Sequence, residues 1–162
     1  MIIVSACLLG LNTKYDGTTN AQALIQKYSS SGKFIPVCPE QLGGLPTPRS
    51  PMEIVNGTGK DVLLGRCAVQ GEQGEVVTSK FVLGAKEVFK IVEMVKVTAA
   101  ILKERSPSCG VNHIYDGSFS HHLRAGQGVT AAILKEHNVP VYSEVELSEE
   151  RILKLLRDDE GH

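Results

Sequence analysis

Short apolar runs rich in β-branched residues alternate along this chain with stretches of helical periodicity. The runs IIVSA (2–6), FIPVCPE (34–40), VTAAILKE (97–104) and VPVYSEVE (139–146) have the length and composition of strands. Strands that alternate with helices imply βαβ units, in which right-handed crossovers place helices on both faces of a mostly parallel sheet. We therefore expect a three-layer α/β fold in a single domain over residues 1–162, without repeats or linkers.

The segments between these runs carry the helix and loop signals. Apolar residues at helical spacing predict helices over 21–28, 81–95 and 125–137, and Ser148 is suited to cap a terminal helix. Residues 61–77 predict two short strands around a Gly-containing turn. Residues 41–53 are dense in Pro and Gly, so we expect a long functional loop there.

Composition narrows the class of protein. Seventeen Lys and Arg residues against eighteen Asp and Glu residues give a net charge of −1, so no basic field indicates nucleic-acid binding. The start MIIVSACLLG lacks the cationic region of a signal peptide, and no apolar run approaches the ~20 residues of a membrane span. We expect a cytoplasmic protein without a membrane partner, whose four cysteines stay reduced rather than forming disulfides.

Three of the cysteines occupy equivalent positions. Cys7, Cys38 and Cys109 each follow a predicted strand and lie in a turn with Gly or Pro. Ligands of open α/β sheets bind outside the carboxyl ends of the strands, so we expect these three thiols to converge on one site. Cys67 falls in the predicted hairpin and is interpreted as a structural residue.

The spacing of the cysteines leaves the chemistry open. No C-x-x-C pair is present, so only the fold can assemble the site. A zinc site would need a fourth ligand such as His113. Three thiolates around a four-iron cluster would leave one iron open to substrate, and a catalytic thiol would use only one of the three cysteines. Each cysteine could also be a buried apolar residue.

The histidines of the chain do not decide between these kinds of site. His121 and His122 lie in the polar segment HHLRAGQG, and we interpret them, like His113, as loop residues rather than metal ligands. The glycines of that segment precede a predicted helix but match no phosphate-binding motif.

Polar residues beside the cysteines are suited to catalysis and binding. Glu40 follows Cys38 by two residues and could transfer a proton. Ser106 and Ser108 precede Cys109 and could relay a proton or orient a ligand. We select four residues for substrate binding: Ser108, Tyr15 as a stacking platform, Asp16 beside it, and Arg49, whose guanidinium offers several hydrogen-bond donors.

Taken together, SACLLG, KYDG, PVCPEQLGGLPTPR and SPSCG closely resemble the DUF523 family, which includes the thiouracil desulfurases. The resemblance extends from the amino terminus to about residue 135. It implies a Rossmann-like domain in which Cys7, Cys38 and Cys109 bind a [4Fe–4S] cluster whose fourth iron takes the sulfur of a thiolated substrate. It also implies that Glu40 and Ser106 are the acidic and hydroxyl groups of the reaction.

From the residues and the resemblance we predict a non-redox desulfurase that acts on a small thiolated heterocycle such as 2-thiouracil. Alternatives are an iron–sulfur sulfur transferase, a lyase, or a metal-binding or redox-sensing protein without enzymatic activity. The expected partner is a small thiolated molecule, and the choice between monomer and homodimer is left open.

Overall fold

The computed structural model describes residues 1–161 and has a four-stranded parallel sheet at its centre. Its strands are β1 (Ile2–Ser5), β2 (Phe34–Val37), β5 (Ala99–Leu102) and β8 (Val141–Ser143), and their order is β2-β1-β5-β8. Each strand lies within one of the four predicted runs. The predicted α/β fold with a parallel sheet is therefore confirmed.

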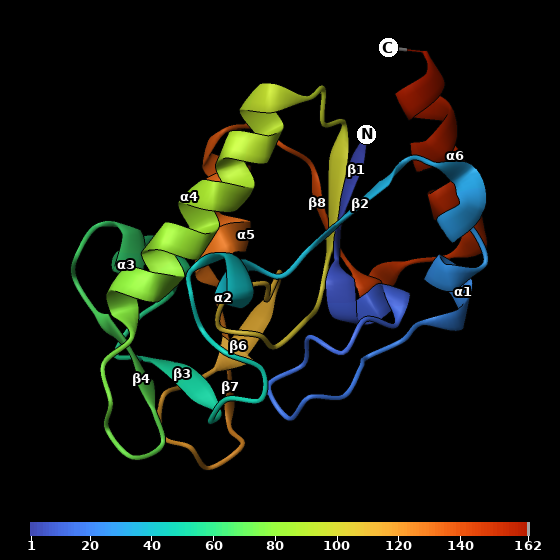
Figure 1. The fold of residues 1–162 in the computed structure, drawn as a ribbon. Coiled ribbons are helices and arrows are strands. Elements are labelled where there is room, and N and C mark those ends of the chain that lie inside the picture. Colours follow the sequence, from blue (N-terminus) through green and yellow to red (C-terminus); the bar gives the residue numbers. More distant parts are fainter. Residues whose placement is uncertain (162) are drawn as a thin grey trace.

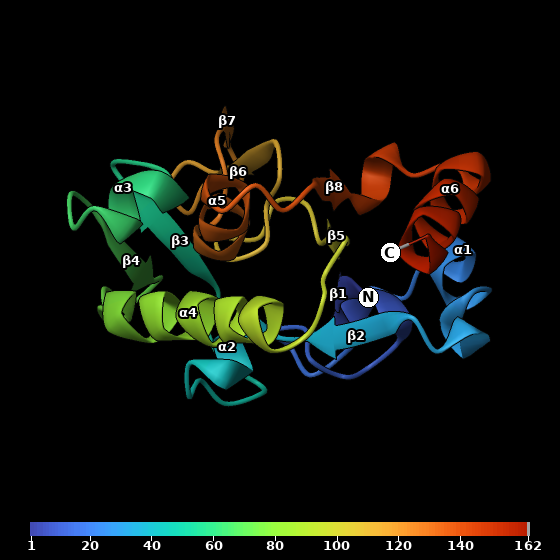
Figure 2. The ribbon, with the colours of Figure 1, turned by 90° about the horizontal axis from the view of Figure 1, so that it is seen from above.

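Helices cover both faces of this sheet (Figure 1 and Figure 2). The longest helix, α4 (Thr78–Met94), and α5 (Val129–Glu136) lie on one face, whereas α1 (Ala23–Gln26) and α6 (Glu149–Glu160) lie on the other. Alternate strand residues face opposite layers, so Ile3 joins the apolar cluster that includes Phe81 of α4, and Ile2 joins the cluster that includes Ile152 of α6. Burial on both faces explains why the strands are almost uniformly apolar.

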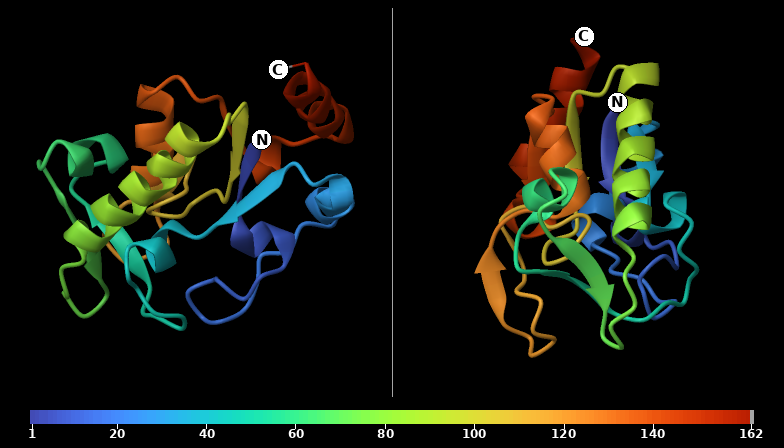
Figure 3. Two further views of the ribbon diagram at one scale, coloured as in Figure 1. Left: turned by 45° about the horizontal axis from the view of Figure 1, so that its top comes forward. Right: turned by 90° about the vertical axis from the view of Figure 1, so that its left-hand side faces the viewer.

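Most of the remaining elements gather near the carboxyl ends of the sheet strands, at the bottom of Figure 1 and in both views of Figure 3. Two antiparallel ribbons lie there, β3 (Met52–Val55) with β4 (Ala68–Gly71), and β6 (His113–Tyr115) with β7 (Leu123–Ala125). Short helices are α2 (Pro39–Leu42) and α3 (Gly59–Leu63), with 3₁₀ turns η1 (Ala6–Leu9), η2 (Ser29–Ser31) and η3 (Glu144–Glu146). Apart from η2, which precedes β2 and so lies at its amino end, and α3, which packs on α5, these elements lie around the end of the sheet that carries the cysteines.

Several predicted elements were wrong in type or length. The hairpin predicted over 61–77 is present only in part: β4 and Val76 form an isolated antiparallel bridge across the Gly-containing turn. The first part of this segment belongs to α3, and the main partner of β4 is β3, which begins in the segment predicted as a loop. A capping box between Thr58 and Asp61 starts α3, which then packs on α5. The predicted helix over 21–28 is only four residues long, and the one over 125–137 begins at Val129, after β7.

Two glycines let α2 lie directly against α4. A side-chain Cβ at Gly84 would come within 1.9 Å of the Pro39 carbonyl oxygen, and one at Gly43 within 2.0 Å of the Lys80 carbonyl oxygen. No larger residue fits at either position without moving the backbone. This contact fixes the helix turn that carries Glu40.

Among the helices of residues 1–161, none combines the length and apolar character needed to cross a membrane.

Candidate active site

The carboxyl ends of β2, β1 and β5 open onto a cavity of about 410 Å³. The chain passes from β1 to β2 on one side and later places β5 on the other side, so the cavity lies where the strand order switches. Such switch points are the usual ligand sites of open α/β sheets, and the volume is within the range of about 300–1,000 Å³ typical of small-molecule pockets. The fold therefore places a small-molecule cavity at the predicted edge.

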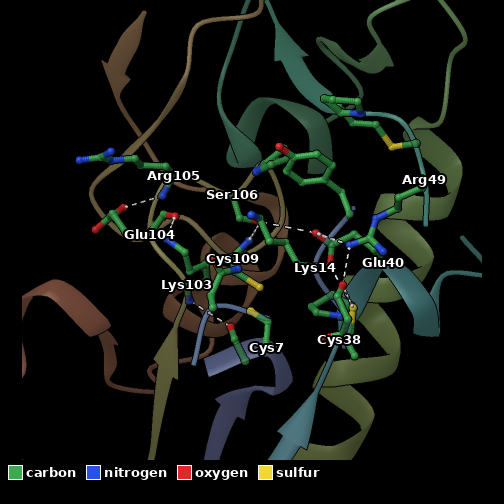
Figure 4. Close-up of a pocket in the computed structure, with 18 of the residues that line it drawn as sticks. Cys7, Lys14, Cys38, Glu40, Arg49, Lys103, Glu104, Arg105, Ser106 and Cys109 are labelled. Atoms are coloured by element: carbon green, nitrogen blue, oxygen red, sulfur yellow. Dashed lines mark hydrogen bonds and ion pairs between the residues drawn. The ribbon is translucent and has the colours of Figure 1, made fainter. Parts of the chain in front are cut away.

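Cys7, Cys38 and Cys109 all line this cavity. Cys7 lies in η1 directly after β1, Cys38 caps the start of α2 after β2, and Cys109 lies in the loop after β5. Figure 4 shows their side chains converging from these three elements. Cys67 does not line the cavity, and its sulfur lies 3.7 Å from the carbonyl oxygen of Thr58. All four cysteines are free thiols in the structure.

The cavity disfavours free thiolates. Burial is the largest cause and raises the pKa of all three thiols, that of Cys38 to about 11. The carboxylate of Glu40 also raises the pKa of each of the three thiols, and Cys7 and Cys38 further raise the pKa of Cys109. The three sulfurs and this carboxylate are thus close enough to repel one another as anions.

Each thiol also has one neutral neighbour that favours its charged form. The Asn20 side chain lowers the pKa of Cys7, the Gln41 backbone N–H that of Cys38, and the Ser5 side chain that of Cys109. These effects are smaller than the effect of burial. Two cations of the cavity lining act in the same sense, because Lys103 lowers the pKa of Cys7 and Arg49 lowers that of Cys38, but burial remains the largest effect on every thiol.

A cationic iron–sulfur cluster fits this donor set. Within residues 1–161, no three His, Cys, Asp or Glu side chains are arranged to hold a single metal ion. Thiolate sulfur is the protein ligand that iron–sulfur clusters take, and a metal centre offsets the cost of gathering thiolates in a buried cavity. Cys7, Cys38 and Cys109 are the residues that could hold such a group.

Glu40 lies between the sulfur ligands and Ser106. Its Oε2 is 3.5 Å from Cys38 Sγ, and its Oε1 accepts a hydrogen bond of 3.5 Å from Ser106 Oγ (Figure 4). Only 9% of Glu40 is exposed. Ser106 Oγ in turn accepts hydrogen bonds from the backbone N–H groups of Ser108 (3.1 Å) and Cys109 (3.0 Å). The structure thus joins Glu40 and Ser106 into one hydrogen-bonded pair beside two of the thiols.

Two of the predicted substrate-binding residues also line the cavity, Arg49 and Tyr15. The guanidinium of Arg49 donates to the carbonyl oxygen of Thr13 (3.1 Å) and to Oγ1 of Thr47 (3.0 Å), and it lies 3.9 Å from Oε1 of Glu40. Its donors are therefore largely used inside the protein. Tyr15 is 43% exposed at the edge of the cavity.

The other two do not reach the cavity lining. Asp16 is exposed: hydrogen bonds from Thr18 are the main cause that lowers its pKa to about 2, and Lys14 pairs with it at 3.0 Å. Ser108 is fully buried, and its hydroxyl lies 2.9 Å from that of Thr130. Both act on neighbouring protein groups rather than on the cavity.

Several lining residues were not selected from the sequence. They include Lys103 and Glu104 after β5, Glu53 of β3, Tyr115 of β6 and His121 of the β6–β7 loop. The sequence does contain a signal for Glu53, since it is a charged residue inside the apolar run MEIV. A carboxylate in a buried strand needs a polar partner. His121 had been interpreted only as a loop residue.

The chain is similar to known proteins in both sequence and structure. A model of the 2-thiouracil desulfurase family matches residues 2–146. The chain is 44% identical over 149 residues to the uncharacterized protein YbbK of Bacillus subtilis (strain 168), covering 92% of this chain and 99% of that protein. Among solved structures, the [4Fe–4S]-dependent thiouracil desulfidase TudS matches with a TM-score of 0.82 and 39% identity, over 95% of this chain and 97% of that one.

Proposed function

Because the chain belongs to the 2-thiouracil desulfurase family, we propose that it removes sulfur from a small thiolated heterocycle such as 2-thiouracil without any redox change. In this reaction water replaces the sulfur of the C=S group, giving the oxygenated ring and hydrogen sulfide. The observation that carries the proposal is the convergence of Cys7, Cys38 and Cys109 with Glu40 in one cavity at the strand ends.

The three thiolates would hold a [4Fe–4S] cluster. When bound, such a cluster supplies one iron without a protein ligand, a Lewis acid that binds the substrate sulfur and makes the attached carbon more electrophilic. The rest of the chemistry falls to the side chains of this chain.

Glu40 is the proton-transfer group of the proposal. Its carboxylate lies within the cavity and next to Cys38, so it can take a proton from the attacking water or deliver one to the ring nitrogen. Ser106 accepts two backbone N–H groups, which directs its own proton toward Oε1 of Glu40. The pair can therefore hold a proton between two oxygens.

Arg49 and Tyr15 have supporting roles. Arg49, only 3.9 Å from Glu40, keeps that carboxylate oriented and partly neutralised. Tyr15 offers an aromatic surface for the ring at the cavity edge.

The test is sulfide release from 2-thiouracil by protein reconstituted anaerobically with iron and sulfide. Cys38→Ser should lose both the visible absorption of the cluster and the release of sulfide. Cys67→Ser is the matched control, because this thiol lies outside the cavity, and it should keep both. A protein that gains the cluster but releases no sulfide would favour a sensor, and a colourless protein with bound zinc would refute the proposal.

A further inference from the structure

Glu53 is a buried carboxylate that the proposed reaction does not use. It lies on β3, is only 8% exposed, and lines the same cavity as the thiols. Its Oε2 accepts hydrogen bonds from two backbone N–H groups of the β6–β7 loop, Gly117 (2.9 Å) and Phe119 (3.1 Å). One oxygen of this carboxylate therefore holds the loop.

The other oxygen, Oε1, has no hydrogen-bond partner among residues 1–161. Every fully buried side-chain oxygen in this part of the chain has a partner, so Oε1 of Glu53 retains accessible surface. Because Glu53 lines the cavity and is otherwise buried, we infer that this surface faces the cavity. A side-chain oxygen is thus available to a ligand there as a hydrogen-bond acceptor.

Two rings next to this carboxylate's loop line the same cavity: Tyr115 at the end of β6 and His121 within the loop. Their ring centroids lie 6.3 Å apart in an edge-to-face arrangement. Gly117 has a φ of 91°, and a Cβ there would lie 2.6 Å from the Ile54 carbonyl oxygen, so the loop packs closely on β3. His121 itself is held at a φ of 60°, an uncommon conformation for a residue with a side chain.

Building on the proposed function, we propose that Glu53 is a substrate-binding residue that selects rings with an N–H next to the thiocarbonyl carbon. Its Oε1 accepts a hydrogen bond from that N–H, while Tyr115 and His121 pack against the ring. In 2-thiouracil, both nitrogens that flank the C=S carbon carry a hydrogen. A ring that lacks the hydrogen on the selected side would leave the carboxylate unpaired and would bind poorly.

The substitution Glu53→Gln tests this assignment. The two loop N–H groups need an acceptor, so the amide oxygen of Gln should face them and its NH₂ should face the cavity. A donor would then meet the N–H donor of the substrate. Glu72→Gln is the matched control, because Glu72 is exposed and lies outside the cavity.

The three proteins, reconstituted with the cluster, are compared on 2-thiouracil and on its 1-methyl and 3-methyl derivatives. In the wild type and in Glu72→Gln, kcat/KM for one of the two methyl derivatives should be about 10- to 100-fold lower than kcat/KM for 2-thiouracil. This is the loss expected when a buried acceptor loses its donor. In Glu53→Gln, kcat/KM for 2-thiouracil itself should fall by a similar factor relative to the wild type. In that variant, kcat/KM for the same methyl derivative should then be little lower than kcat/KM for 2-thiouracil. Calorimetric binding of uracil and its two methyl derivatives should follow the same pattern.

Equal losses on all three substrates in Glu53→Gln, together with a lower melting temperature, would mean that Glu53 only holds the loop, and would overturn the inference. A methyl penalty that persists in Glu53→Gln would also overturn it, because the penalty would then be steric. Failure of the proposed function is distinct: the wild type would release no sulfide, whereas calorimetry with uracil would still test Glu53.

Discussion

Two buried carboxylates beside the cavity have very different surroundings. Glu104, after β5, accepts four backbone N–H groups at Oε1, from Arg105 (3.4 Å), Val111 (2.9 Å), Asn112 (3.0 Å) and His113 (3.0 Å). Within residues 1–161, Glu40, after β2, accepts no backbone N–H; its hydrogen-bond partners are the Ser106 hydroxyl, at a long 3.5 Å, and the Cys38 thiol, also at 3.5 Å. Both residues are less than a tenth exposed.

We propose that this difference separates a structural carboxylate, Glu104, from a reactive one, Glu40. Burial raises the pKa of Glu104, but the hydrogen bonds from His113, Asn112, Val111 and Ser143 outweigh it and lower the pKa to about 2. Such a group stays ionised and holds the loop between β5 and β6. The hydrogen bonds of Glu40 are long enough to be exchanged for bonds to water or substrate, which is what proton transfer requires.

The largest expected effect is the loss of turnover in Glu40→Gln. Gln cannot exchange a proton, so sulfide release should fall by about 10²- to 10⁴-fold, the contribution of a general acid or base. Iron content and melting temperature should remain close to the wild type. Glu104→Gln serves as the control with a matched buried carboxylate, and an equal loss of rate in both variants would remove the distinction between them.

Glu104→Gln should instead reduce stability. Its carboxylate accepts hydrogen bonds from five N–H donors, including Nδ2 of Asn112 at 3.2 Å, and hydrogen bonds to a charged group contribute about 1.5–3 kcal/mol each. Since Gln keeps one oxygen acceptor, we expect the free energy of unfolding to fall by about 1–3 kcal/mol. Urea denaturation at neutral pH measures this change, and an unaltered midpoint would contradict it.

The same carboxylate predicts a pH dependence of stability. The pKa of Glu104 falls from its ordinary value of 4.5 to about 2 in the folded protein, so its contribution is present above pH 4.5 and is lost as the pH falls toward 2. The wild type should lose stability over this window more steeply than Glu104→Gln. The free energy of unfolding is measured by urea denaturation of both metal-free proteins at several pH values. If it changes equally with pH in the two proteins, Glu104 is not the group responsible.

A smaller effect is expected for Ser106→Ala. Removing the hydroxyl leaves the N–H groups of Ser108 and Cys109 without their acceptor, at a cost of about 1–2 kcal/mol in the free energy of unfolding. Turnover should fall less than in Glu40→Gln, because water can replace the hydroxyl. Rates and melting curves of the two variants, measured together, check this order.

The smallest effect is expected for Asp16→Asn. Asp16 is exposed and bound to Thr18 and Lys14, outside the cavity lining. The kcat/KM for 2-thiouracil should stay within about twofold of the wild type, as for most surface substitutions. A larger drop would show that the loop carrying Asp16 takes part in binding.

The main sheet and the longest helix could be predicted from the sequence because their patterns are local. The strands are apolar on both faces, and the predicted helix over 81–95 corresponds to α4 at Thr78–Met94. The β6–β7 ribbon could not be predicted in this way. All residues of β7 are exposed, so no hydrophobic alternation marks it, and its loop is fixed by Glu53 from a distant strand.

The sequence by itself determined that Cys7, Cys38 and Cys109 follow three strands of a parallel sheet. Carboxyl ends of parallel strands share one edge, so this pattern alone brings the thiols together. Only the tertiary structure decided which polar groups join them. Asp16 and Ser108 are near the cysteine motifs in sequence but engage other protein groups, whereas Glu53 reaches the cavity from β3. The reason is physical: side-chain neighbours are set by packing between distant segments, which no local spacing encodes.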